Sequence, residues 1–495
     1  MIDTATTYQP NIPLGKGQLN ERLTSITLSV SGKDSLSITR ISFQVEGNPK
    51  AIQKVRLYAN GSLMRWQDST SVLLGESKKF NDSICFSINQ KLAAGTHVFW
   101  LVGDIKKSTP EGTLLGLFAK SYTVSGQVKL IQRPENLYLR PVLLAHQLLF
   151  SAGDYGSKNY RIPAIVSNGK RVLVACDKRY DGISDLPNNI DLISQYSDDY
   201  GKTWSKPITI ADFGSEGASD PALVWDKKSG DLLCLFASHN GLMASTPSNS
   251  IRFQVARSSD FGETWQESKD FTSAIYLPGW QAAWVASGSA HQLEDGRIVA
   301  AIGVRTSAST VISNYMIYSD DGGHSWHASP GQASPVGDEA KIVELNDHRL
   351  MMLIRNRGKR KVSFSSDRGN SWTEPVFQEE LIEPAVDGDF IRYSSTKNGA
   401  SKDRLLFSIT AHPTLRKNLT VFVSYDEGKS WGTSRVICPI ESAYSALTTF
   451  DDGTIGVFYE NGEYETYQLY YTRFSLRWLT NGTDTFSKPQ KKKSK

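Results

Sequence analysis

The octet SDDYGKTW, from Ser197 to Trp204, recurs four more times along the chain with the pattern Ser-x-Asp-x-Gly-x-Thr/Ser-Trp. The other copies are SSDFGETW at Ser258–Trp265, SDDGGHSW at Ser319–Trp326, SSDRGNSW at Ser365–Trp372 and SYDEGKSW at Ser424–Trp431. By subtraction, their aspartates lie 61, 61, 46 and 59 residues apart. A repeat of this length predicts an array of similar structural units.

Each octet is suited to a tight hairpin turn. Asp and Ser side chains hydrogen-bond nearby backbone amides, Gly supplies the positive φ that such a turn needs, and the closing Trp can pack beneath the next strand. A pattern needed five times over indicates scaffold better than it indicates five metal ligands or catalytic acids. We therefore interpret the octets as structural.

The sequence around the octets predicts short β-strands. Apolar or alternating runs enter each turn, and further apolar runs lie between them: QVARSSD, NYMIYSDD, KVSFSSD, TVFVSYD, RVLVAC, DLLCLFA, RIVAAIGV, RLMMLIRN and RLLFSIT. Four such strands make a propeller blade, and about 335 residues hold roughly six units of about 55 to 60 residues. The predicted fold is all-β, with a six-bladed β-propeller over residues 136–480 in which one blade lacks its octet.

The region before the propeller has strands but no octet. After an N-terminal segment, residues 1–20, the stretch 21–135 contains six or more short strands with Gly and Asn turns, which is typical of an antiparallel, jelly-roll-like β-sandwich. Trp66 and Trp100 belong either to its core, which we favour, or to a sugar-binding face that would give the domain a glycan contact. Residues 481–495 are expected to form a flexible basic tail.

Composition excludes several functional classes as defaults. The chain has 55 basic and 51 acidic residues, a formal net charge of +4, which favours neither nucleic acid nor a membrane surface as partner. No apolar run is long enough to cross a bilayer. The first ten residues lack the features of a secretory signal, so the chain is either cytoplasmic or written without its leader.

Cysteine and histidine spacing predicts neither disulfides nor a metal site. The four cysteines are scattered through apolar strand sequence, where buried free thiols are the favoured interpretation: Cys85, Cys176, Cys234 and Cys438. His291 and His412 show no ligand spacing. We therefore expect no metal and no cofactor.

Three arginines occupy comparable places beside predicted strands. Arg161 precedes Ile-Pro at the opening of the first propeller strand, Arg355 ends an apolar strand, and Arg416 follows another. Equivalent strand ends converge on one axial face of a radial fold, so these arginines could share a pocket that suits a carboxylate or phosphate. For any one of them taken alone, a surface salt bridge is the simpler explanation.

Taken together, the motifs resemble the exo-α-sialidase (neuraminidase) family of retaining glycosidases, which are six-bladed propellers with Asp-box repeats. The resemblance extends from Tyr160 to about Arg473 and includes the five octets. Its other motifs are YRIP, GDEAKIVELNDHRLMMLIRN, AHPTLR and ESAYSALTTFDDGTIGVFYE. The N-terminal region is similar to the sandwich that precedes the propeller in bacterial members.

The resemblance implies a role for each matching residue. Arg161, Arg355 and Arg416 correspond to the triad that binds the sialic acid carboxylate. Tyr444 corresponds to the nucleophile and Glu339 to the general base that accepts its proton.

Further roles follow from the same resemblance. Asp185 corresponds to the acid/base, Glu460 to the glutamate that orients the first arginine, and Arg179 adds a cationic contact at the rim. Several alternatives stay open: Asp181 or Asp191 in place of Asp185, a surface ion pair of Asp177 with Arg179, and core packing of Tyr444. Asp220, Pro221 and the stretch from Trp280 to Trp284 suit either the acetamido and glycerol pockets or aromatic core.

A tyrosine nucleophile, an exception among glycosidases, suits this substrate. The anomeric carbon of sialic acid carries a carboxylate, so an attacking Asp or Glu would meet like-charge repulsion, which a neutral phenol avoids. The ordinary pKa of tyrosine, about 10, requires a neighbouring base to accept the proton during attack.

The predicted activity is that of a retaining exo-α-sialidase. It would release terminal sialic acid from glycoproteins, glycolipids and oligosaccharides through a sialyl-tyrosine intermediate. The alternatives are a trans-sialidase, an intramolecular trans-sialidase, or a non-catalytic sialoglycan-binding propeller, which the presence of all three catalytic residues disfavours. The resemblance implies sialylated glycoconjugates as partners and a secreted, periplasmic or cell-surface location.

Overall fold

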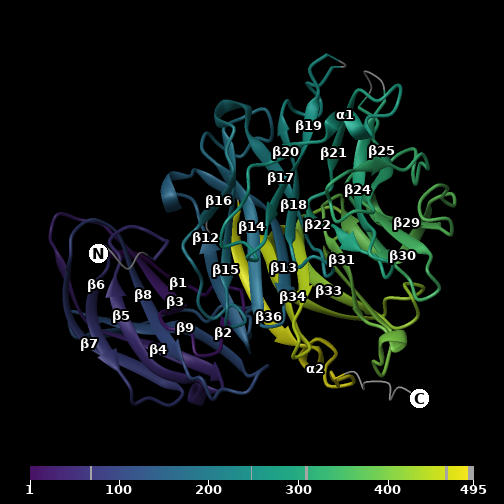
Figure 1. The fold of residues 1–495 in the computed structure, drawn as a ribbon. Helices are drawn as coiled ribbons and strands as arrows, with labels where there is room; N and C mark the ends of the chain where they lie inside the picture. Colours follow the sequence, from purple (N-terminus) through teal and green to yellow (C-terminus); the bar gives the residue numbers. More distant parts are fainter. Residues whose placement is uncertain (67–69, 247, 307–309, 463–466, 489–495) are drawn as a thin grey trace. The chain divides into compact units, whose positions relative to one another are not determined.

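A computed structural model describes residues 1–66, 70–246, 248–306, 310–462 and 467–488. Apart from two single-turn α-helices and four 3-10 turns, its regular structure is β-sheet, which confirms the predicted class. The chain divides into two compact units, Met1–Gln147 and Leu148–Lys495 (Figure 1).

The first unit is a β-sandwich of two sheets around one apolar core. One sheet has the order β1 (Ile2–Tyr8), β3 (Glu21–Val30), β8 (Gly95–Ile105), β5 (Ile52–Ala59) and β6 (Val72–Ser77). The other has the order β2 (Leu14–Gly15), β11 (Arg140–Leu143), β9 (Leu114–Val124), β4 (Leu36–Gly47) and β7 (Ser83–Leu92), with β10 (Gln127–Leu130) paired to β9. Alternate residues such as Leu28, Phe43 and Phe99 face the core and are buried.

The structure places the domain limits differently from the sequence prediction. Residues 1–20 are not a separate segment, because β1 pairs with β3 and β2 pairs in parallel with β11. Residues 136–143 do not open the propeller, because β11 also pairs with β9 in the sandwich. Trp100 is fully buried core, whereas the partly buried Trp66 makes an edge contact with Tyr58, with ring centroids 5.7 Å apart.

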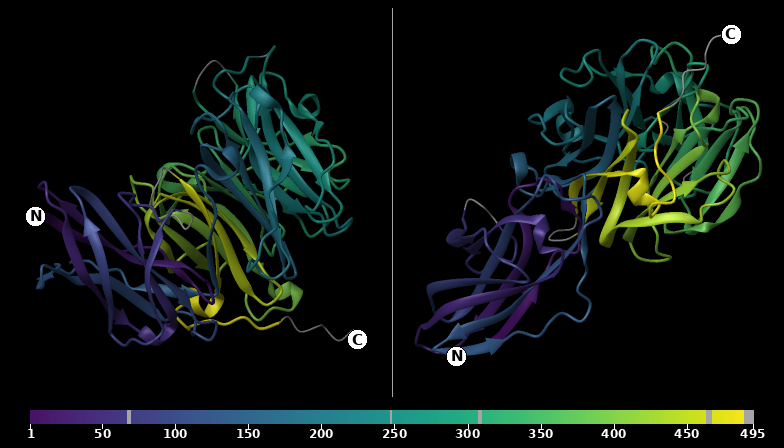
Figure 2. Two further views of the ribbon diagram at one scale, coloured as in Figure 1. Left: turned by 90° about the vertical axis from the view of Figure 1, so that its left-hand side faces the viewer. Right: turned by 90° about the horizontal axis from the view of Figure 1, so that it is seen from below.

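The second unit is a propeller whose described residues form six antiparallel blades (Figures 1 and 2). The first is β13 (Asn159–Asn168), β14 (Arg171–Arg179), β15 (Ile190–Ser197) and β16 (Ile208–Ala211). The second is β17 (Ala218–Trp225), β18 (Leu232–His239), β19 (Ile251–Ser258) and β20 (Lys269–Asp270). The third is β21 (Ala282–Val285), β24 (Ile298–Arg305), β25 (Ser313–Ser319) and β26 (His327–Ala328). The fourth is β27 (Ala340–Glu344), β28 (Leu350–Ile354), β29 (Arg357–Ser365) and β30 (Val376–Pro384).

The last two blades share one long strand. The fifth contains β31 (Asp389–Ser394), β32 (Arg404–Thr410), β33 (Lys417–Ser424) and the first half of β34 (Thr433–Thr449). The second half of β34 begins the sixth blade, which continues through β35 (Thr454–Asn461), β36 (Gln468–Ser475) and β12 (Ala145–Phe150). A strand from the start of the propeller thus completes its last blade.

Shorter elements complete the propeller. Strand β22 (Gly288–Ser289) pairs with β17, and β23 (His291–Gln292) pairs with β24. The helices are α1 (Thr272–Ile275) and α2 (Leu476–Leu479). The 3-10 turns of the chain are η1 (Pro49–Ala51) in the sandwich, and η2 (Asp154–Gly156), η3 (Gly214–Glu216) and η4 (Thr396–Asn398) in the propeller.

The five octets join the third strand of a blade to its fourth and share one hydrogen-bond pattern. In the third blade, Ser319 Oγ donates to Asp321 Oδ1 at 2.8 Å and accepts from the N–H of Gly323 at 2.8 Å. The carboxylate also accepts from the backbone N–H of Ser325, at 2.9 Å, and from its hydroxyl, at 2.6 Å. The other four octets repeat these bonds, so the first Ser and the Asp of every octet hold its turn.

The sixth blade lacks an octet for a topological reason. Its third strand, β36, and its fourth, β12, come from opposite ends of the domain and are not joined by a hairpin. An octet that closes such a hairpin has no place there.

The segment after the last blade is partly packed. Asp484 is buried and forms an ion pair with Arg404, with Nε and Oδ2 2.7 Å apart, and Phe486 contacts the ring of Tyr393. The predicted tail, residues 481–495, is therefore ordered structure over 481–488, and the rest of it lies outside the described residues. In the described part of the chain, no helix has the length and apolar character of a membrane span.

Candidate active site

Arg161 is fixed at the start of β13 by a buried carboxylate. Arg161 donates from Nε to Glu460 Oε1 at 2.8 Å and from Nη2 to Oε2 at 3.0 Å. The register of β13 with β14 shifts between Arg161 and Ala164, where Ile162 has a φ of 60° and its N–H also donates to Glu460 Oε1. A bulge of this kind re-aims side chains at the end of a strand. Glu460, on β35, thus holds the Arg161 guanidinium in place.

The same carboxylate holds the backbone of Tyr444. The N–H of Tyr444 donates to Glu460 Oε2 at 3.0 Å, at a register shift between β34 and β35. One buried glutamate therefore sets the positions of an arginine and a tyrosine that are far apart in sequence.

Tyr444, Glu339 and Arg355 form a compact group. The Tyr444 hydroxyl donates to Glu339 Oε1 at 2.5 Å, and Arg355 Nη1 donates to the same hydroxyl at 2.9 Å and to Glu339 Oε2. Glu339 directly precedes β27 and Arg355 directly follows β28, and the N–H of Arg355 donates to the carbonyl of Glu339 across this hairpin. The hairpin therefore brings base and arginine side by side.

The electrostatics leave the proton on the phenol and the charge on the carboxylate. Burial raises the pKa of Tyr444 well above its usual value and Glu339 adds to this, against the opposing charges of Arg355 and Arg161. Burial also raises the pKa of Glu339, but the charge of Arg355 and hydrogen bonds from Tyr444 and Arg355 outweigh it and set this pKa below its usual value. Glu339 is therefore ready to accept the Tyr444 proton.

Three guanidinium groups surround the Tyr444 ring. The Cζ atoms of Arg161, Arg416 and Arg355 lie 5.2, 5.8 and 6.0 Å from the ring centroid. Arg416 is placed by a backbone bond in which the N–H of Ser442 donates to its carbonyl at 2.9 Å. The structure therefore brings the three predicted arginines to one place.

Arg416 carries the free charge of this group. Arg161 is paired with Glu460, and Arg355 with Glu339. Within the described part of the chain, Arg416 has no ion pair, and its Nη2 donates only to the carbonyl of Ala385, at 3.3 Å. The cluster therefore suits a ligand with one negative charge.

Asp185 lies on the exposed loop that joins β14 to β15. Its side chain is 75% exposed, and its Oδ1 lies 2.8 Å from Arg179 Nη1. Arg179 is buried and donates twice to Asp177, from Nε at 3.2 Å and from Nη2 at 2.7 Å. The Asp177–Arg179 ion pair is thus buried, not on the surface, and it anchors Asp185 through Arg179.

Other acids near this loop differ in their availability. Asp191 is buried on β15 and accepts from the Tyr180 hydroxyl at 2.5 Å. Asp181 and Arg179 line a small cavity of about 80 Å³ under the loop. Asp220 has a φ of 63° and its N–H donates to Asp177; burial, then Asp177, Asp185 and Glu339, raise its pKa well above the usual range. Asp220 is thus a partly buried acid, close to the predicted acid/base, in a setting that favours its neutral form.

The structure separates core aromatics from site aromatics. Trp280 and Trp284 are buried in the third blade, where Trp280 packs against Tyr276 and Tyr315. Sequence reasoning missed Tyr467, whose ring centroid lies 4.6 Å from the Cζ atom of Arg161. The segment YETYQLYY carries no motif that distinguishes this tyrosine from its neighbours.

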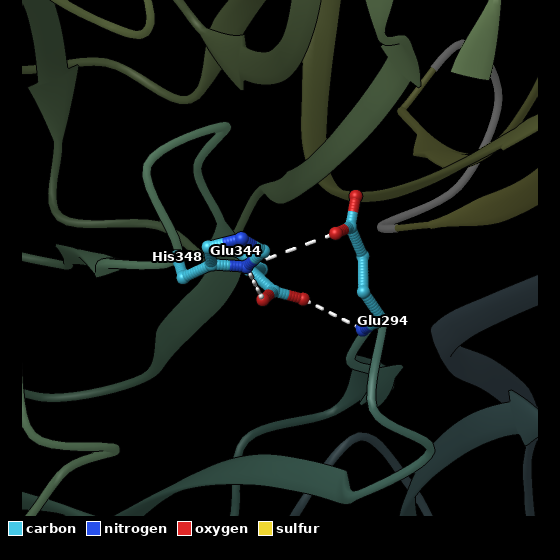
Figure 3. Close-up of side chains that lie close together, drawn as sticks. All are labelled: Glu294, Glu344 and His348. Atoms are coloured by element: carbon cyan, nitrogen blue, oxygen red, sulfur yellow. Dashed lines mark hydrogen bonds and ion pairs between the residues drawn. The ribbon is translucent and has the colours of Figure 1, made fainter. Parts of the chain in front are cut away.

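Two other features lie away from these residues. A cavity of about 920 Å³ is lined by residues such as His291, Glu344 and Arg392, and by none of the predicted site residues. At its edge, Glu294, Glu344 and His348 bring ligand-type atoms within 4.8 Å of one another (Figure 3). These side chains pair among themselves: His348 Nδ1 lies 3.1 Å from Glu344 Oε1 and 3.7 Å from Glu294 Oε2. An exposed ion-pair cluster accounts for the arrangement.

Sequence comparison relates most of the chain to known proteins. The BNR repeat-like domain family matches residues 187–457, more than half of the chain. The chain belongs to the bacterial sialidase family. A sialidase of Micromonospora viridifaciens is 32% identical over 360 residues, which is 68% of this chain and 54% of that protein. A sialidase of Bacteroides fragilis is 26% identical over 479 residues, 90% of this chain and 85% of that one. The chain thus spans about half the length of the first relative and most of the second.

Solved structures of sialidases share the fold. The Hadza microbial sialidase Hz136 superposes with a TM-score of 0.76 at 24% identity, over 96% of this chain and all of that one. The intramolecular trans-sialidase of Ruminococcus gnavus gives a TM-score of 0.58 at 19% identity, over 68% of this chain and 98% of that one. The match to Hz136 covers both units of this sialidase-family chain.

Proposed function

We propose that this sialidase-family protein is a retaining exo-α-sialidase that works through a sialyl-tyrosine intermediate. The observation that carries the proposal is the group at Tyr444: its hydroxyl donates to the Glu339 carboxylate at 2.5 Å, and three arginines surround its ring. Tyr444 is a buried nucleophile with its base beside it, and in the described part of the chain only two of the three arginines are paired with buried glutamates. This arrangement suits attack on a carbon that bears a carboxylate.

In the first half of the reaction, Tyr444 Oη attacks the anomeric carbon while Glu339 accepts the phenolic proton. The bond to the glycosidic oxygen breaks, and Asp185 gives that oxygen a proton. In the second half, Asp185 takes a proton from water, the hydroxide attacks the anomeric carbon, and Tyr444 leaves and recovers its proton from Glu339. Two displacements at one carbon give overall retention.

Arg161, Arg355 and Arg416 would hold the substrate carboxylate in this scheme. The bond from Arg355 Nη1 to the Tyr444 hydroxyl also stabilises negative charge on that oxygen as its proton leaves. The loop bearing Asp185 is exposed at that residue and is held by the ion pair with Arg179 and by Leu186, which packs against a buried cluster that includes Trp284.

Time-resolved proton NMR of sialyllactose tests the proposal. Wild type should release the α-anomer of sialic acid first, and Tyr444→Phe should slow release by at least about a thousandfold. An anhydro or transferred product would place the protein among transferases with the same site. No turnover of any sialoside would leave a sialoglycan-binding propeller and overturn the proposal.

The covalent intermediate can be tested separately by mass spectrometry. A 2,3-difluorinated sialic acid should add one sugar to the wild-type peptide that contains Tyr444, and nothing to Tyr444→Phe. Label on another residue would contradict the assigned nucleophile.

The substrates that we propose are terminal sialosides of glycoproteins, glycolipids and oligosaccharides, met outside the cytoplasm. Fractionation of the native host, with antibody detection of the protein, tests the compartment. A chain confined to the cytoplasm would contradict that part of the proposal.

A further inference from the structure

A buried lysine lies directly behind the predicted base. Lys341 is two residues after Glu339 and on β27, and residues at this spacing point to the same side of a strand. Its side chain is 1% exposed. Its Nζ donates to both carboxylate oxygens of Asp387, at 2.9 and 2.7 Å. A cation is thus held in the protein interior on the side where Glu339 lies.

The far end of the Lys341 side chain packs beside Gly288. A Cβ on Gly288 would lie 3.5 Å from the Lys341 Cε, 3.8 Å from the carbonyl oxygen of Pro163 and 3.9 Å from the Cβ of Ala446. Gly288 lies on β22, which pairs with the second blade; Pro163 lies in the first blade and Ala446 in the sixth, whereas Lys341 belongs to the fourth. The lysine therefore extends to the propeller axis, where the inner strands of the blades converge.

The carboxylate partner is held as firmly as the lysine. Asp387 Oδ1 accepts from the N–H of Gly388 at 2.9 Å, and Oδ2 accepts from Ser287 Oγ at 3.2 Å. Arg360, which is fully buried, is paired mainly with Glu383 and lies 3.9 Å from Asp387. Because every partner is fixed, the Lys341 charge cannot move away from the base.

The charges that act on Glu339 come from several elements. They are Asp338 beside it, Arg355 after β28, Tyr444 on β34, Asp220 on β17, Lys341 on β27 and Asp387 before β31. Of the two cations, Arg355 faces the pocket and would be shared with a substrate carboxylate. Lys341 is buried and stays with the base when substrate binds.

We infer that Lys341 is a positioning residue that keeps Glu339 ionised in the substrate complex, with Asp387 as the anchor of the lysine. The inference rests on the proposed function, because it assigns Lys341 a part in activating Tyr444. When the substrate carboxylate occupies the arginines, Arg355 supports Glu339 less. Lys341 then supplies the remaining positive charge, so that Glu339 can still accept the phenolic proton.

The test is the pH dependence of kcat, which reports groups in the substrate complex. The acidic limb records protonation of Glu339. Lys341→Met and Lys341→Gln remove the charge, so the limb should move to higher pH by roughly one unit, as expected for the loss of a buried positive charge that acts on Glu339. Asp387→Asn removes the carboxylate of the same ion pair and leaves the Lys341 charge. The acidic limb should therefore stay at the wild-type pH or move to lower pH.

The outcomes separate an electrostatic role from a structural one. A limb that is unmoved in folded Lys341→Met and Lys341→Gln, or that rises equally in Asp387→Asn, overturns the inference. Failure of both lysine variants to fold gives Lys341 a structural role and also overturns it. Thermal unfolding of each variant reports the folded state.

A second readout does not depend on turnover. Glutamate labelled with ¹³C at the side-chain carboxyl allows Glu339 to be titrated by NMR in the full chain, with Glu339→Gln giving the assignment. The Glu339 pKa should rise in Lys341→Met and not in Asp387→Asn. If the wild type hydrolyses no sialoside, the proposed function fails. If the Glu339 pKa is the same in Lys341→Met as in wild type, only the inference about Lys341 is overturned.

Discussion

Arg355 lies between two carboxylates that behave differently. Glu339 is paired with its Nη1, whereas Asp338 Oδ2 lies 3.5 Å from its Nε. Burial, and then the charge of Glu339, raise the pKa of Asp338 to about 6, although Arg355 opposes the shift. Asp338 is therefore largely neutral below pH 6 and becomes a competing anion beside Arg355 above it.

This titration predicts a pH-dependent KM. Above about pH 6, ionised Asp338 competes with the substrate carboxylate for Arg355, so KM should rise roughly threefold to tenfold between pH 5 and pH 7. Asp338→Asn should flatten this rise. Steady-state kinetics at constant ionic strength check it, with the exposed Asp347→Asn as control. An equal slope in wild type and Asp338→Asn would show that another group titrates.

The acid/base role of Asp185 predicts a dependence on the leaving group. A sugar alcohol needs a proton as it leaves, and a nitrophenolate does not. Asp185→Asn should therefore lose roughly a hundredfold to ten-thousandfold in kcat/KM on sialyllactose and far less on a nitrophenyl sialoside. Asp220→Asn, which replaces the other nearby acid, should affect both substrates alike. If Asp220→Asn shows the selective loss, the acid is Asp220.

Residues in local motifs could be predicted, and residues that meet only in the fold could not. Arg161 stands in YRIP and Tyr444 in ESAYSAL, so the order of the motifs was enough to propose them. Lys341 and Asp387 are 46 residues apart and pair across two blades, and nothing in either local sequence indicates that contact. The position of Tyr467 against Arg161 likewise depends on how the blades are arranged.

At the level of elements, the octet turn is the repeated feature. Asp321 accepts four hydrogen bonds, and these lower its pKa to about 2 although burial opposes them. Because this pKa is lower in the folded than in the unfolded chain, the carboxylate stabilises the fold above about pH 4, and the contribution is lost as the pH falls toward 2.

Asp321→Asn should therefore destabilise the propeller without changing catalysis. We expect a loss of about 1 kcal/mol in the free energy of unfolding at pH 7, since charge-assisted bonds on an exposed turn are replaced by weaker ones. The loss should shrink near pH 2.5. Asp320→Asn, next to it and paired on the surface with Arg297 and Arg368, is the control and should cost less. A reduced kcat in Asp321→Asn would contradict a purely structural octet.

Element boundaries show what a strand pattern leaves open. The octets correctly placed five hairpin turns, because the turn chemistry is local. The pattern did not show that β34 runs for 17 residues through two blades, because its residues from Ser442 to Thr448 are all buried and the change of partner strand has no local signal. The sandwich strand β11 was assigned to the propeller side, since its parallel partner β2 precedes it by a long stretch of sequence.

At the level of the whole molecule, the propeller ring depends on β12. Without this strand, the sixth blade would have three strands, and β36 would expose an unpaired edge. Phe150, at the end of β12, is fully buried, and its ring centroid lies 5.1 Å from that of Tyr160 and 6.4 Å from that of Phe458. It therefore ties the closing strand to the first and sixth blades.

Phe150→Ala should lower the stability of the propeller selectively. Removing a buried phenylalanine costs about 3 to 5 kcal/mol, here at the point where the ring closes. The matched control is Phe43→Ala, which removes an equally buried ring from the core of the sandwich. The propeller's unfolding transition is the one that coincides with loss of sialoside turnover. In calorimetry, the midpoint temperature of this transition should fall in Phe150→Ala and stay unchanged in Phe43→Ala. Equal shifts in both variants would mean that the two units unfold together, and that closure of the ring is not what limits the stability of the propeller.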